Sequence, residues 1–222
     1  GRGLRGMGGS SSLYLGASQI GTHCSLLDPT ISLPQTAKSR LREEDRDRLL
    51  AYLHIFQRRR FPLPHRRLLS LATSPDDELA SAALFALANL GDPEVRALAL
   101  ELIELERPPG GSPDLVLRLL IQNYQEGDHR IIERLLADET DRDEFHELGL
   151  RAMNVFEANK TPDAQDSLML IYERGPCSTC REKCLGLLHS LDLLPDWIMD
   201  ECRYDSNPEI RMQVRDWRGP VV

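Results

Sequence analysis

Four cysteines in the C-terminal part of the chain have a spacing that could bind a metal ion. Cys177, Cys180 and Cys184 follow one another at i, i+3 and i+7, and Cys202 lies 18 residues beyond the third. On a helix the first three side chains share one face, so their thiolates could bind one ion, with Cys202 completing a tetrahedral zinc site from the next segment. These four residues are therefore the candidate metal ligands, and a structural zinc is the one cofactor that the sequence suggests.

The same spacing is compatible with two other states of these cysteines. A free cysteine behaves as a small buried hydrophobe, and the repeats described below place Cys180 and Cys184 where Leu79 and Ala83 stand in an earlier segment. A disulfide involving Cys177 or Cys202 is the third alternative. The sequence leaves packed thiols, a zinc site and a disulfide open.

A second group of residues with chemical potential is a cluster of five arginines around Phe-Pro-Leu-Pro at 61–64. Its members are Arg58, Arg59, Arg60, Arg66 and Arg67. Such a cluster could bind an anion or an acidic partner. The alternative is a solvated corner between two helices. Elsewhere no Ser or Cys lies in a recognisable nucleophile motif and no two histidines have ligand spacing, so we expect no catalytic residue.

Short amphipathic helices must position these residues. Six apolar residues between Leu79 and Leu90 fall at offsets 0, 3, 4, 7, 8 and 11, which is one stripe on a helix. Ser74-Pro75-Asp76 predicts the start of this helix, and Gly91 is placed for a left-handed residue at its end. Asp92-Pro93 then predicts the start of a second helix, whose apolar stripe begins at Val95.

The stripe recurs along the chain, which predicts a repeat. Stripes start at residues 79, 145, 180 and 210, with steps of 66, 35 and 30 residues. A unit of about 30 to 35 residues fits these steps if one less regular unit precedes residue 145. A shorter apolar segment precedes each stripe, so each unit is expected to contain two helices. The Pro- and Gly-rich stretch 106–113 is a loop insertion.

Two pentapeptides indicate which repeat this is. Asp92-Pro-Glu-Val-Arg96 and Asn207-Pro-Glu-Ile-Arg211 are nearly the same, and they resemble the start of the second helix in HEAT and HEAT-like (armadillo-type) repeats. The resemblance implies an all-α fold, a right-handed α-solenoid of stacked helix pairs, over roughly residues 64–218. It also likens Arg96, Arg181 and Arg211 to the basic ladder of that family. It implies no activity.

One dipeptide resembles a site found in HEAT-like enzymes. His146-Glu147 is similar to the His-Glu dipeptides of deoxyhypusine hydroxylases, which hold a di-iron site. That family has several such dipeptides, and this chain has one. We therefore interpret His146 as a residue on a helix surface.

The composition divides the chain into three parts. Residues 1–36 are rich in Gly, Ser and Pro and are expected to form an irregular N-terminal arm or the end of an upstream domain. Residues 37–63 contain a predicted capping helix at 38–57, since the first repeat needs a cover. The HEAT-like repeats are expected in residues 64–222.

Charge restricts the choice of partner. The formal net charge is −8. Residues 1–67 contain 12 Lys/Arg and 5 Asp/Glu, a net charge of +7, whereas residues 68–222 contain 15 Lys/Arg and 30 Asp/Glu, a net charge of −15. Nucleic acids require clustered cations, so the acidic repeats argue against a nucleic-acid partner. With no apolar run of 18 residues we also expect no transmembrane helix and a cytoplasmic location.

The expected function is that of a non-catalytic protein-interaction scaffold, binding a partner with a basic patch along the solenoid surface. One alternative is an enzyme or enzyme accessory similar to the HEAT-like bilin lyases or DNA glycosylases. Another is a zinc-stapled structural domain of a larger protein. The sequence leaves the identity of the partner and the oligomeric state open.

Overall fold

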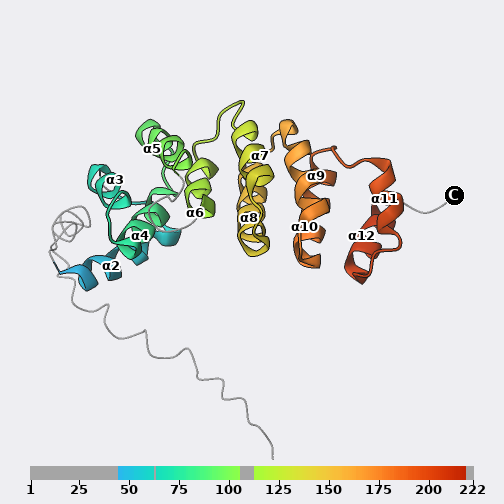
Figure 1. Cartoon of the computed structure of the whole chain (residues 1–222), viewed down its shortest axis with the longest axis horizontal. Helices are drawn as coiled ribbons and strands as arrows, with labels where there is room; N and C mark the ends of the chain where they lie inside the picture. The colour runs from blue at the N-terminus through green and yellow to red at the C-terminus, as the bar shows by residue number, and fades with distance from the viewer. Residues whose placement is uncertain (1–44, 63, 106–112, 219–222) are drawn as a thin grey trace, which may run out of the picture.

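The computed structural model describes residues 45–62, 64–105 and 113–218, and all regular elements within these ranges are helical (Figure 1). This confirms the predicted all-α class for the described part. The predicted arm at 1–36, the start of the capping helix and most of the loop at 106–113 lie outside the described residues. The elements are α2 (Arg46–His54), η2 (Ile55–Arg58), α3 (Arg66–Ala72), α4 (Asp77–Leu87), α5 (Pro93–Ile103), α6 (Pro113–Leu117), η3 (Arg118–Ile121), α7 (His129–Asp138), α8 (Arg142–Asn159), η4 (Pro162–Ala164), α9 (Gln165–Arg174), α10 (Ser178–Ser190), α11 (Asp196–Cys202) and α12 (Pro208–Arg218).

The helices follow one another along the long axis of the molecule in chain order (Figure 1). The elements in contact are close in sequence: α4 packs against α2 and α3, α8 against α6, α7 and α10, and α11 against α12. The buried apolar residues form one core cluster that runs from α2 to α12. No helix in the described ranges has the length and apolar content needed to cross a membrane.

The predicted helix starts are confirmed at α4 and α5. The Asp76 carboxylate accepts hydrogen bonds of 3.1 Å from two backbone N–H groups in the first turn of α4. The Asp92 carboxylate accepts one of 2.8 Å from Glu94 N in the first turn of α5, where Pro93 is the first helical residue. In each case a short acidic side chain satisfies N–H groups that the helix leaves unpaired.

The predicted end of the first helix is wrong in detail. α4 ends at Leu87, and Gly91 is not among the residues with positive φ. The amide of Asn89 donates a hydrogen bond of 3.1 Å to Phe85 O, a carbonyl in the last turn of α4. A side chain thus satisfies a terminal carbonyl group, and a left-handed glycine is not needed there.

The predicted apolar stripes are buried. Only Leu79, Leu191 and Trp217 are half-buried, and each lies at one end of its stripe. Large side chains such as Leu84, in α4, and Phe156, in α8, have no exposed surface. The apolar residues whose spacing predicts each helix therefore also pack in the core shared with the neighbouring helices.

Three asparagines connect successive segments in the same way. Asn89, Asn123 and Asn159 each donate from the side-chain amide to the carbonyl four residues earlier and to a second carbonyl 32 to 38 residues earlier. The distances to the second carbonyl are 2.8 Å to Phe56 O, 2.9 Å to Leu90 O and 3.2 Å to Ile121 O. This ladder of asparagines was not predicted, although their spacing of 34 and 36 residues is close to the length of the predicted repeat.

The predicted capping helix is present in its described part as α2 and η2. Leu49, Leu50 and Leu53 of α2 are buried, and the helix packs on α4 at one end of the row (Figure 1). The Arg46 guanidinium donates to the carboxylates of Asp76 (2.5 Å) and Glu78 (2.6 Å). α2 therefore occupies the place expected of a capping element.

Candidate functional site

Two of the four predicted metal-binding cysteines lie together, and a histidine joins them. Cys177 immediately precedes α10, Cys180 lies in the first turn of that helix, and His146 comes from α8. The Cys180 Sγ atom is 3.5 Å from His146 Nδ1. The possible ligand atoms of the three residues lie within 4.8 Å of one another. Cys180 is buried, and Cys177 and His146 are half-buried. We call these residues the thiol–imidazole cluster.

The turn that leads to this cluster requires a glycine. Gly175 N donates to Ile171 O at 2.8 Å at the end of α9. A Cβ atom at residue 175 would lie 2.5 Å from that same oxygen. Any other residue would have to move the backbone, because only glycine allows so close an approach. Gly175 therefore determines the path of the chain through Pro176 to Cys177.

The two thiols of the cluster differ in acidity. The pKa of Cys177 is lowered by nearby hydrogen-bond donors, first the backbone N–H of Cys180, then the Cys180 thiol, and to a smaller extent Thr179. The Cys177 side chain itself does not cap α10. Burial raises the pKa of Cys180 to about 11, and the neighbouring Cys177 adds to this effect. Since the thiolate is the reactive form, Cys177 is the nucleophilic thiol of the pair.

This difference predicts the order of alkylation in reduced, chelator-treated protein. Near neutral pH, iodoacetamide is expected to modify Cys177 at least about ten-fold faster than Cys180, because a lower pKa gives a larger thiolate fraction. Burial raises the pKa of Cys184 to about 12, so this thiol should react only after unfolding. Timed alkylation followed by peptide mass spectrometry measures each rate. Faster modification of Cys184 than of Cys177 would contradict the assignment.

The other two predicted ligands, Cys184 and Cys202, lie outside the cluster. Cys184 Sγ donates to Leu168 O at 3.0 Å, and Cys202 Sγ is 3.5 Å from the Tyr172 hydroxyl. Both side chains are buried, and all four described cysteines are free. Cys184 lies one turn beyond Cys180, where the thiol meets the backbone of α9. These two residues are packed core thiols.

The five predicted anion-binding arginines are all exposed. Their side chains form no ion pair with another described residue. Arg60 lines a pocket of about 330 Å³. Phe61 anchors this corner in the core, with its ring 4.9 Å from that of Phe56. The five exposed arginines of this predicted site are Arg58, Arg59, Arg60, Arg66 and Arg67.

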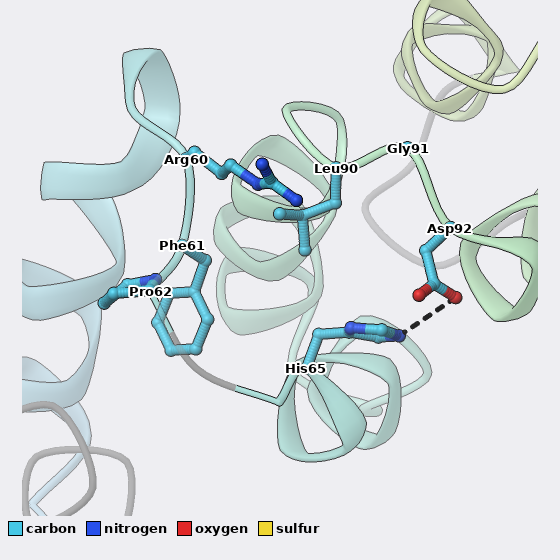
Figure 2. A pocket seen from close by; sticks show the side chains of 7 residues that line it. All are labelled: Arg60, Phe61, Pro62, His65, Leu90, Gly91 and Asp92. Atoms are coloured by element: carbon cyan, nitrogen blue, oxygen red, sulfur yellow. Dashed lines mark ion pairs between the residues drawn. The ribbon is translucent and has the colours of Figure 1, made fainter. Parts of the chain in front are cut away.

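Figure 2 shows the interior of this pocket. The Arg60 side chain extends toward Leu90, while His65 faces the carboxylate of Asp92. His65 Nε2 is 3.3 Å from Asp92 Oδ1 and 3.4 Å from Glu94 Oε2. The pocket therefore combines the guanidinium of Arg60 with the imidazole of His65 and the carboxylate of Asp92, and it is not a purely cationic site.

A larger groove, which was not predicted from the sequence, lies between α9, α10 and α11. Its volume is about 570 Å³. Trp197 is 53% exposed in this groove although it is a large apolar side chain. The Arg181 guanidinium forms a bidentate ion pair with the Asp205 carboxylate, with N–O distances of 2.9 and 3.1 Å. We call this the Trp197 groove; it is lined by Tyr172, Glu173, Arg181, Trp197, Glu201, Asp205 and Ser206.

Two carboxylates of the Trp197 groove remain available to a ligand. Glu173 and Glu201 are exposed and form no ion pair with another described residue. The sequence signal for the groove was the position of Trp197, directly beside Ile198, which is buried in the core. On a helix, neighbouring residues cannot share a face, so burial of Ile198 turns the indole outward.

The residues that resemble a basic ladder each bind a nearby acidic or carbonyl group. Arg96 donates to the Asp128 carboxylate at 2.5 and 2.8 Å. Arg211 donates to the backbone oxygens of Asp205 (2.6 Å) and Ser206 (3.1 Å). With the Arg181 pair, all three connect neighbouring segments or fix the turn between α11 and α12. They are structural cations.

His146 was not predicted to be a partner of the thiols. The available signal was its separation of 34 residues from Cys180, which is about the length of one predicted repeat. The interpretation as a surface residue considered only its own helix. Comparisons of the chain with protein-family models, curated proteins and solved structures found no match.

Proposed function

We propose that the described helices form a right-handed α-solenoid of HEAT-like pairs, and that the protein is a non-catalytic scaffold for a protein partner. The observation that carries the proposal is a series of side-chain contacts between residues about one repeat apart. In the five examples given next, the separations run from 30 to 37 residues. Examples are Arg96–Asp128, Tyr124–Thr161, His146–Cys180, Tyr172–Cys202 and Gln213–Glu182.

Contacts of this kind favour a scaffold because they build an elongated molecule. When each unit contacts mainly its neighbours, the surface grows with the number of units and offers an extended binding face. The asparagine ladder supports the same reading, since three equivalent side chains make equivalent contacts along the chain. All four cysteines in the described ranges are free thiols, which is typical of the cytoplasm, where we place the protein.

The Trp197 groove is the proposed contact for the partner. An exposed tryptophan beside two available carboxylates suits an arginine or lysine side chain, which can lie on the indole face and pair with an acid. The net charge of −15 over residues 68–222 attracts a basic segment to this region. We therefore expect the partner to contribute a basic peptide segment.

Selection from a displayed random peptide library tests the proposal. We expect the purified protein to enrich peptides rich in lysine and arginine, with binding that weakens as salt rises. Trp197→Ala should weaken binding by about ten-fold or more, as for a hot-spot residue. The matched control is Ile55→Ala, which removes an equally exposed side chain (53%) at the other end of the molecule. Failure to enrich basic peptides, or equal binding by both variants, would refute this function.

A further inference from the structure

We propose that His146, Cys177 and Cys180 bind one zinc-class divalent metal ion, with three protein ligands and a fourth position for water. The inference is independent of the proposed scaffold function. It also differs from the four-cysteine site that the sequence suggested, because one ligand is a histidine from a different helix and Cys184 and Cys202 are excluded.

The geometry of the thiol–imidazole cluster is close to that of a tetrahedral site. Zinc binds sulfur at about 2.3 Å and imidazole nitrogen at about 2.0–2.1 Å, so two such ligands at a tetrahedral angle lie about 3.6 Å apart. The distance between Cys180 Sγ and His146 Nδ1 is 3.5 Å. All three ligand atoms lie within 4.8 Å of one another. Binding therefore needs only small movements of side chains.

The donor atoms select the class of metal. Two thiolates and one imidazole suit zinc and related borderline or soft ions, and they do not suit calcium or magnesium, which require oxygen ligands. Two thiolates also balance the charge of a divalent ion. Binding replaces the protons of both thiols, so each ion bound by the reduced protein releases up to two protons.

The surroundings fix which residues can reach the ion. Cys184 donates to Leu168 O, and Cys202 contacts Tyr172, so both thiols are already committed to the core. Cys177 and His146 are half-buried, which leaves a path for the ion from solvent. Because the ligands come from α8 and from the start of α10, the ion would link two neighbouring segments.

Anaerobic titration of reduced, chelator-treated protein with Co²⁺ tests this site, followed by Zn²⁺ competition and elemental analysis. We expect one ion per chain and the thiolate charge-transfer and visible bands of tetrahedral cobalt. Cys177→Ser and His146→Asn should each weaken binding by more than about a hundred-fold, since loss of even an outer-shell partner costs 10–100-fold. Cys177 precedes α10 and is half-buried, so its variant should keep the circular dichroism of the folded protein.

Cys184→Ser is the matched control. The serine hydroxyl can still donate to Leu168 O, as the thiol does, but it would not replace the Cys184 thiolate if that thiolate bound the metal. It should bind one ion with unchanged affinity. Loss of binding in this variant would support the four-cysteine site and overturn our assignment. Full binding by His146→Asn would equally overturn it, as would the absence of cobalt binding by the reduced protein.

Discussion

Replacing Phe156 by alanine is expected to lower the free energy of unfolding by about 3–5 kcal/mol. Phe156 lies in α8, has no exposed surface and belongs to the common apolar core. α8 contacts α6, α7 and α10, so its neighbours cannot all move to fill the space left by the ring. The loss therefore includes the transfer of the ring to water and a residual cavity. Urea denaturation followed by circular dichroism measures it.

Tyr204→Ala is the control for this prediction. It also removes an aromatic ring, but from a side chain that is 84% exposed. Its expected effect is within about 0.5 kcal/mol, as for other surface substitutions. If both variants lost the same amount, burial of Phe156 would not be the source of its contribution.

Replacing Arg96 by methionine is expected to lower the free energy of unfolding by about 3 kcal/mol. The substitution keeps much of the aliphatic volume of the side chain and removes the guanidinium. Asp128, whose side chain is 4% exposed, would then keep a buried carboxylate without its cation. The backbone oxygen of Asn123 would also lose its 2.9 Å bond from Arg96. Urea denaturation at neutral pH measures the loss.

The exposed pair formed by Arg134 and Glu104 provides the matched control. Its N–O distance is 2.5 Å, the same as that between Arg96 and Asp128, but its side chains are 51% and 65% exposed. Arg134→Met is therefore expected to cost less than about 1 kcal/mol. Equal losses in the two methionine variants would mean that burial does not set the strength of these pairs.

Local features of the helices could be predicted from the sequence because they depend on residues near one another. Asp76 and Asp92 begin α4 and α5 since a side-chain oxygen and the following N–H groups are only two or three residues apart. Apolar spacing likewise marked the buried faces, as for Val95 and Phe156. The end of α4 was predicted less well, because Asn89 satisfies carbonyls of two segments and makes a left-handed Gly91 unnecessary.

The candidate sites depended on contacts that the sequence does not state. Spacing alone placed Cys184 with Cys177 and Cys180, whereas the packing of α9 turns the Cys184 thiol to Leu168 O. The Trp197 groove exists because α9, α10 and α11 meet there.

By itself the sequence determined the all-helical class of the described residues, the starts of α4 and α5 and the buried stripes, since these follow from the spacing of neighbouring residues. Only the tertiary structure decided which thiols meet a histidine. His146 and Cys180 are 34 residues apart, and they lie 3.5 Å from one another because α8 packs against α10. Such a contact depends on the angle and register of two helices, which many side chains set together.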